Sequence, residues 1–118
     1  MDKKENTYKT YSYPVLALRG MPIFPNAVVH FDVGRDISIK AVEQAMENDK
    51  KIMIVAQIDP DVEHPQSEDF YDVGTLCQIK QVLRISEESV RILIRGVERA
   101  KITELLEKNS IYECSAQI

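Results

Sequence analysis

Hydrophobic and polar residues alternate along several stretches of this chain, as they do in strands that bury one face. Residues 14–18 form a short apolar run, and residues 28–33 place Val, Phe and Val on one face against Val, His and Asp on the other. These patterns predict two strands, with order beginning at Tyr13. Residues 52–56, IMIVA, are continuously apolar, which predicts a central strand covered on both faces.

A single amphipathic helix is predicted between the second and third of these strands. Gly34 and Asp36 form a strand-to-helix signal, because glycine tolerates a positive φ and aspartate stabilises a helix N-terminus. We expect the helix from about Arg35 to Asn48. Apolar residues recur along it at three- and four-residue steps, so one face should pack inward. The inward residues are Ile39, Val42, Ala45 and Met46.

The alternation is clearest after Gly74, where a long half-buried strand is predicted. Its inward parity holds Cys77, Ile79, Leu83 and Ile85. Residues 86–89 form a polar turn, and the pattern resumes until Gly96, where we expect a bulge or bend. The register of this hairpin should pair Ile85 with Val90, which directs Leu83 toward the core.

The same register predicts a basic stripe on the outer face of the hairpin, with Arg84 opposite Arg91 and Lys80 opposite Arg95. Like charges placed opposite one another destabilise a sheet unless acids or a partner intervene. The stripe is therefore a solvated face or a contact to the rest of a larger protein. Nucleic-acid binding is the weaker interpretation, because no aromatic residue is interleaved to stack bases.

Residues 57–70 are acidic and contain two prolines, which predicts a surface loop. The stretch from Asp59 resembles the start of a calcium loop. It places His64 at the sixth position and Phe70 at the twelfth, where glycine and a bidentate acid are required. The metal interpretation therefore fails.

Residues 112–118 alternate as a last strand, and because the chain stops inside it we expect a fragment of a longer protein.

Length, charge and cysteine content narrow the class of protein. The 118 residues suit one domain, and a net charge of -4 does not favour nonspecific nucleic-acid binding. Cys77 and Cys114 match no metal or redox spacing, and both lie on inward parities, so we expect them to be buried and inert. No signal peptide or membrane span is indicated. A cytoplasmic, soluble protein without a metal site is expected.

Candidate catalytic residues are sparse. His30 shares a strand face with Asp32, which could orient its imidazole, but no local motif places a nucleophile beside it. An exposed strand histidine is the favoured interpretation. The chain contains neither G-x-G-x-x-G nor G-x-x-x-x-G-K-[ST], so it should not hydrolyse ATP.

The stretch LRGMPIFPN is the remaining candidate. Its prolines stiffen the backbone and prevent simple continuation of a sheet. An exposed apolar corner here would suit unfolded polypeptide or a neighbouring subunit. The hypothetical substrate-binding residues are Met21, Ile23, Phe24 and Pro25, and half-buried turn packing is the competing interpretation.

Four segments together resemble the N-terminal domain of the Lon ATP-dependent proteases. They are PVLALRGMPIFPNAVVHFDVGRDISIKAVEQAM, KIMIVAQIDPDVEHP, DFYDVGTLCQIKQVLRI and VRILIRGVERAKI. The resemblance covers residues 13–102, and the motifs LRG, FP, DVGR, VGT and RGVERA are specific in combination. It implies an α+β, mainly β fold, a PUA-like pseudobarrel of about six strands with one helix. That domain would span residues 13–118, truncated at its C-terminal end, after a flexible polar N-terminus of residues 1–12.

The resemblance also implies a function. Such a domain recognises unfolded or degron-bearing proteins and helps to organise a homohexamer, in a protease that degrades misfolded and regulatory proteins. The Ser-Lys protease domain and the ATPase domain, which uses ATP and Mg, are not matched by these residues, so the fragment should be non-catalytic and need no cofactor. The alternative is a stand-alone LON/PUA-like module that binds protein or RNA without a protease.

Overall fold

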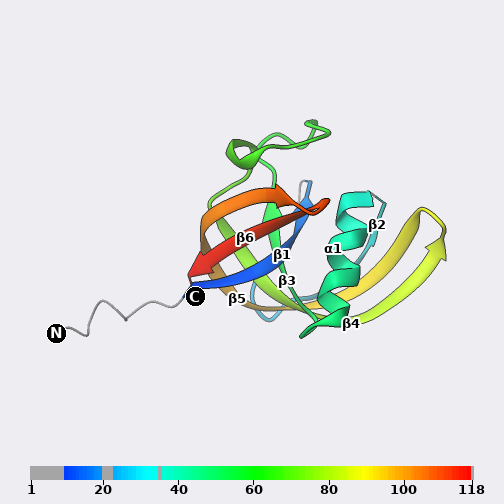
Figure 1. Ribbon diagram of the computed structural model, residues 1–118. Helices are drawn as coiled ribbons and strands as arrows, with labels where there is room; N and C mark the ends of the chain where they lie inside the picture. The colour runs from blue at the N-terminus through cyan, green and yellow to red at the C-terminus, as the bar shows by residue number, and fades with distance from the viewer. Residues whose placement is uncertain (1–9, 20–22, 35, 118) are drawn as a thin grey trace.

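The computed structural model describes residues 10–19, 23–34 and 36–117. Within these ranges the chain forms six strands, one α-helix and one short 3₁₀ helix (Figure 1). Their order is β1 (Thr10–Leu18), β2 (Val28–Val33), α1 (Asp36–Glu47), β3 (Lys51–Ala56), η2 (Ser67–Asp69), β4 (Val73–Ser86), β5 (Ser89–Lys108) and β6 (Ile111–Gln117). The expected mainly β class with one helix is confirmed, and the helix bounds agree with the prediction.

The strands form one curled sheet that closes on itself. Their order is β2-β5-β4-β3-β1-β6, and β6 pairs again with the second half of β5. β1 and β3 run parallel, and the other neighbours are antiparallel. Because β5 is 20 residues long, its first half can pair with β2 while its second half closes the barrel. This is the expected pseudobarrel, with β2 added at one side.

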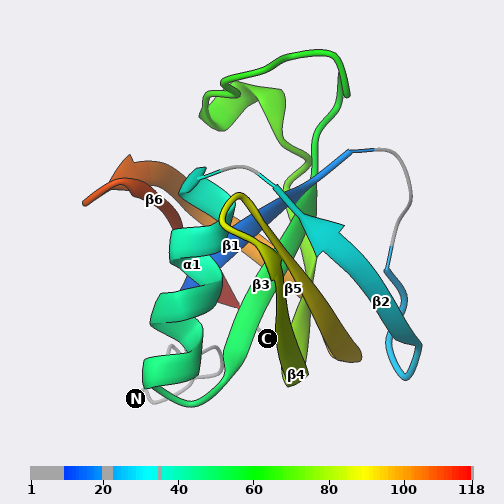
Figure 2. The same ribbon diagram turned by 90° about the vertical axis from the view of Figure 1, so that its right-hand side faces the viewer.

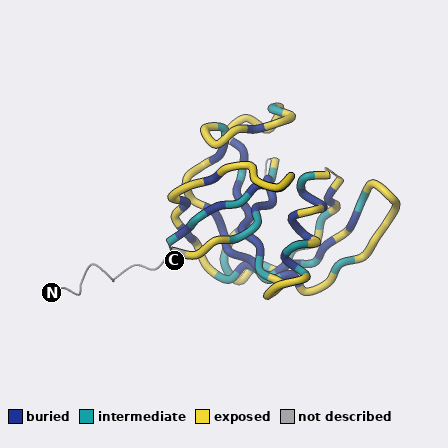
Figure 3. The backbone as a smooth tube through the Cα atoms, in the orientation of Figure 1, coloured by how far each residue is buried: buried dark blue, intermediate teal, exposed yellow. Residues whose placement is uncertain are grey.

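The core has two parts, which meet at β3. Ile52 and Ile54 face the part that α1 covers, whereas Met53 and Val55 face the part inside the barrel. All four are buried, which confirms the prediction of a central strand. Figure 3 shows the buried inner side of α1 and the exposed tip of the β4–β5 hairpin.

The register of the β4–β5 hairpin differs from the prediction by one residue. A bulge between Ile79 and Gln81 inserts Lys80 and reverses the inward parity beyond it. Val82 now pairs with Ile92, while Leu83 is 54% exposed. The predicted inward positions of Leu83 and Ile85 are therefore wrong. The expected irregularity near Gly96 is confirmed by a second register shift between Leu76 and Cys77.

The ends of the strands extend beyond the sequence pattern. β1 begins at Thr10, three residues before the expected start of order, because Thr10–Val15 pairs with β6.

The loop after β3 is mostly exposed, as predicted, but it is anchored by buried Gln57 and Pro65. The Tyr112 hydroxyl donates to the Pro65 carbonyl at 2.7 Å. No helix within the described ranges has the length and apolar character needed to cross a bilayer.

Candidate functional site

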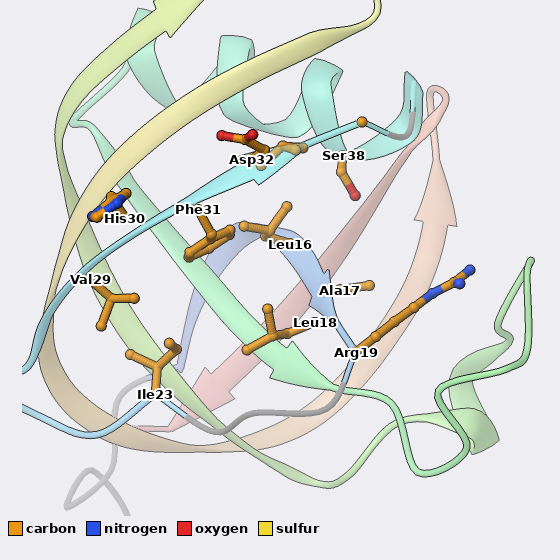
Figure 4. A pocket seen from close by; sticks show the side chains of 12 residues that line it. Leu16, Ala17, Leu18, Arg19, Ile23, Val29, His30, Phe31, Asp32 and Ser38 are labelled. Carbon is orange, nitrogen blue, oxygen red and sulfur yellow. The ribbon is translucent and has the colours of Figure 1, made fainter.

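A groove of about 460 Å³ lies between β1, β2 and the first turns of α1 (Figure 4). Two of its walls are runs of consecutive residues, 16–19 at the end of β1 and 29–34, which cover most of β2 and the residue after it. Successive residues of a strand point to opposite faces, so a wall of consecutive residues is a strand edge rather than a strand face. Ile23 and Ser38 complete the lining. The groove thus separates two strand edges.

Apolar side chains dominate the interior of the groove. Leu16 is buried, and Leu18, Val29 and Phe31 are partly buried and pack against the core. Figure 4 shows Leu16 from β1 and Phe31 from β2 directed toward each other. The alternating pattern of β2 produces this arrangement, because it directs Val29 and Phe31 to one side and Val28 and His30 to the other.

The stretch that joins β1 to β2 divides between core and surface. Ile23 is only 5% exposed, and the Thr75 hydroxyl donates a hydrogen bond to its carbonyl at 2.7 Å. Phe24 is 54% exposed and Pro25 is half-buried. The predicted exposed corner is therefore found at Phe24, whereas Ile23 packs into the core and lines the groove. Met21 lies outside the described residues.

A tight turn holds Phe24 in place beside β5. The Asn26 N–H donates to the Gly96 carbonyl at 2.8 Å, and the Gly96 N–H donates to the Ala27 carbonyl at 2.9 Å. The Arg99 guanidinium lies 5.4 Å from the centre of the Phe24 ring, within range of a cation–π contact. The turn thus holds an exposed aromatic side chain on a fixed backbone, one residue after the groove-lining Ile23.

The polar groups that line the groove are mostly engaged elsewhere. The Arg91 Nε donates to the Asp32 carboxylate at 2.8 Å, and this hydrogen bond lowers the pKa of Asp32. Asp32 therefore binds Arg91, and it does not orient His30, which is exposed. The Ser38 hydroxyl is buried and has no hydrogen-bond partner among the residues that the structure describes. A largely apolar groove with a neutralised carboxylate suits binding better than acid–base chemistry.

Comparisons with known proteins agree with this picture. The family model described as the ATP-dependent protease La (LON) substrate-binding domain matches residues 12–118. The chain belongs to this Lon family. It is 47% identical over 100 residues to the Lon protease of Clostridium acetobutylicum and 42% identical over 102 residues to that of Brevibacillus choshinensis. These matches cover 85% and 86% of the chain, but the chain spans only 13% of each relative.

Two solved Lon structures share the fold. The N-terminal domain of the Mycobacterium avium complex Lon protease aligns with a TM-score of 0.71 at 21% identity, covering 90% of this chain and 53% of that one. The Lon N-terminal domain protein from Xanthomonas campestris aligns with a TM-score of 0.68 at 12% identity, covering 92% and 59%. At these identities the likeness establishes the Lon N-terminal fold alone.

The predicted basic stripe is not a single surface of this Lon domain. The bulge at Lys80 places Arg84 opposite Val90 rather than Arg91, on the side of the sheet that α1 covers. There Arg84 lies 3.5 Å from Glu43 of α1. Arg91 and Arg95 remain on the outer face, where Arg91 pairs with Asp32. The predicted pairings were therefore wrong, and the contact role proposed for these four residues stays a prediction.

The other candidate groups also have structural partners. His64 Nε2 lies 2.9 Å from the Glu107 carboxylate. Among the described residues, no cluster of three or more His, Cys, Asp or Glu side chains could hold a metal ion. Cys77 and Cys114 are free and buried as expected, and burial raises the pKa of each thiol to about 12. Both thiols are thus protonated at neutral pH.

Sequence reasoning predicted the exposure of Phe24 but missed the groove, and the substrate-binding role of Phe24 stays a prediction. The groove requires β1 and β2 to lie on either side of one space, and those strands are not neighbours in the sheet. The sequence did carry a partial signal, since its alternation placed Val29 and Phe31 on the same face of a strand. Ser38 was missed because a serine in a helix gives no sign of whether its hydroxyl will find a partner.

Proposed function

We propose that this chain is the substrate-recognition and oligomer-organising N-terminal domain of an ATP-dependent serine protease, and that it is itself non-catalytic. The observation that supports this most is the apolar groove between β1 and β2, with exposed Phe24 one residue after the groove-lining Ile23, in a chain of the Lon substrate-binding family. Apolar clefts with few polar groups bind ligands through surface burial. Unfolded segments of proteins supply such apolar surface.

Recognition by this domain is weak at each copy and gains strength by repetition. In a homohexamer, several copies would act on one misfolded or degron-bearing protein, which raises the overall affinity without tight individual sites. The ATPase and protease domains of the parent would supply ATP and Mg chemistry and the Ser-Lys dyad. The buried, free thiols of Cys77 and Cys114 suit a reducing compartment, and we place the protein in the cytoplasm.

Protein binding is favoured over RNA binding because two of the arginines of the predicted basic stripe are paired with carboxylates. Arg84 and Arg91 are each within ion-pair distance of a carboxylate. The net charge of -4 repels phosphates at long range. A mobility-shift assay with RNA at moderate salt should accordingly show no complex.

Two serine variants of equally exposed apolar residues test the proposal. Phe24 and Leu83 are each 54% exposed and neither lines the groove, but Phe24 directly follows the groove-lining Ile23 in the chain. Phe24→Ser should weaken binding to a reduced, carboxymethylated and permanently unfolded protein by about fivefold, since half of a Phe side chain contributes about 1 kcal/mol. Leu83→Ser should bind as the wild-type chain does. Fluorescence anisotropy measures both affinities, and equal affinities for the two variants would contradict the proposal.

A further inference from the structure

Strand β2 has a neighbour on one side only. It pairs with β5 from Val28 opposite Arg95 to Val33 opposite Val90, without a register shift. In the described part of the chain, no strand pairs with its other side. Figure 2 shows β2 at the margin of the sheet, on the side away from β3 and β4. One edge of β2 is therefore available for pairing.

The backbone groups on this edge can be identified from the ladder. Gly96 donates its N–H to the Ala27 carbonyl, and hydrogen-bonded residues alternate along an antiparallel pair. The residues of β2 that bond to β5 are therefore Val29, Phe31 and Val33. The N–H and C=O groups of Val28, His30 and Asp32 face away from β5. They form a row of donors and acceptors about 14 Å long on a strand of about 20 Å.

This edge lacks the features that usually protect edge strands. Natural edges are blocked by proline, lysine, a bulge or very short length. β2 has six residues, VVHFDV, with no proline, no lysine and no bulge. Its one carboxylate, on Asp32, is neutralised by Arg91. The edge is therefore chemically suited to accept another strand.

The groove lies along the same edge and would receive the side chains of an added strand. Consecutive residues 29–34 form its wall, so a strand paired with β2 would run within it. Every second side chain of that strand would point toward Leu16, Leu18 and Phe31, and the others would point toward the exposed side with His30. The groove thus selects for alternating apolar residues.

A buried hydroxyl at the end of the groove gives a second, independent indication. Ser38 is 3% exposed, and within the described ranges its Oγ has no hydrogen-bond partner. In Figure 4 this oxygen points away from the helix toward the space beside β1. Because buried polar groups are nearly always hydrogen-bonded, a partner is missing from this position. A peptide backbone in the groove would bring both donors and acceptors to it.

We propose that an extended polypeptide segment with apolar residues at every second position binds by adding to the free edge of β2. This inference rests on the recognition role proposed above and specifies its substrate class, the strand-like segments that unfolded β-sheet proteins expose. Backbone pairing would supply affinity, and the groove would supply selection, as in other cases of strand addition.

A second copy of this chain is the less suitable occupant. Pairing two edges about 20 Å long buries much less than the roughly 1,200 Å² that stable interfaces require. Two copies, each with a net charge of -4, also repel each other. An uncharged segment avoids this repulsion and fits a groove whose carboxylate is already paired.

The test compares His30→Pro with His30→Ala. Both variants lose the imidazole, but only proline removes the outward N–H and covers the edge with its ring. The ladder to β5 is kept, because the N–H of residue 30 does not bond to β5. The probe is a peptide of about ten residues that alternates valine and threonine, with a permutation at helical spacing as its control. His30→Pro should bind the alternating peptide about tenfold more weakly than His30→Ala.

Amide hydrogen exchange of the wild-type chain provides a second readout, which does not depend on the folding of a variant. Saturation with the alternating peptide should slow exchange at Val28, His30 and Asp32, whereas the permuted peptide should not. Equal affinities of the two variants, or no added protection at these amides, would overturn strand addition. If the unfolded protein still bound, the recognition role would stand. If the unfolded protein did not bind, both proposals would fail. Slow exchange of these amides in the absence of peptide, together with the mass of a dimer in light scattering, would instead show that a second copy of the chain pairs with this edge.

Discussion

Gly96 is the position at which a single methyl group should be most damaging to the turn beside the groove. A Cβ at this residue would lie 2.4 Å from the Phe24 carbonyl oxygen and 3.2 Å from the Pro25 Cα. Contacts under 3.0 Å are essentially never tolerated, so in Gly96→Ala the turn must move by about 0.6 Å or more. The atoms that block the methyl group belong to the backbone, which cannot rotate away.

The cost follows from what the displaced turn would lose. Two hydrogen bonds, from Asn26 to Gly96 and from Gly96 to Ala27, hold it against β5. Each contributes about 1 kcal/mol, and part of the packing of Ile23 would be lost with them. We therefore expect Gly96→Ala to lower the free energy of unfolding by about 3 kcal/mol. For a domain of this size that corresponds to a fall in Tm of about 10 °C.

Urea unfolding followed by far-UV circular dichroism measures this change, and Gly34→Ala is the matched control. A Cβ at Gly34 would lie 3.8 Å from the Glu88 carbonyl oxygen, which is ordinary contact. Gly34→Ala should therefore unfold within about 1 kcal/mol of the wild-type chain. Equal midpoints for the two variants would refute the close approach of the turn to β5, and with it the fixed position of Phe24.

Three further predictions test other parts of the structure. Leu83→Ser should alter the free energy of unfolding by less than about 0.5 kcal/mol, whereas Ile92→Ala should lower it by about 2–5 kcal/mol. A large loss of stability in Leu83→Ser would instead support the register predicted without a bulge, in which Leu83 is buried. Because Arg91 lowers the pKa of Asp32, this ion pair contributes its full stabilisation above the ordinary Asp pKa and loses it progressively as the pH falls from there through the lowered pKa. The stability difference between the wild-type chain and Asp32→Asn should therefore shrink between pH values of about 7 and about 3 in urea titrations, and a constant difference would exclude the pair. Ser38→Ala should leave the free energy of unfolding unchanged or raise it by about 1 kcal/mol, since it removes a buried hydroxyl that has no hydrogen-bond partner in the described part of the chain. A clear fall in the free energy of unfolding would show that the hydroxyl is hydrogen-bonded.

Local patterns were sufficient to predict most of the fold. The continuous apolar run of β3 indicated burial on both faces, and the helical spacing of Ile39, Val42 and Ala45 identified the inner face of α1. The family resemblance then supplied the closed arrangement of the strands. These features are encoded within short windows, so neighbouring residues are enough to reveal them.

The features that failed depend on contacts between distant segments. The bulge at Lys80 arises from pairing between β4 and β5, and no residue near it marks an insertion. Ile23 lies in a stretch whose prolines suggested exposure, yet its carbonyl is held by Thr75, far along the chain. The groove and the free edge of β2 likewise exist only once the barrel has closed. For this reason the site was predicted less well than the fold.

Chemical-shift mapping of the ¹⁵N-labelled chain during titration with the permanently unfolded protein tests the central claim most directly. If the groove recognises polypeptide, the amide resonances that change should cluster at residues 16–19, 23–24 and 28–33. A spectrum that stays unchanged at saturating concentrations, or changes confined to the far end of the barrel around Leu106, would contradict the account.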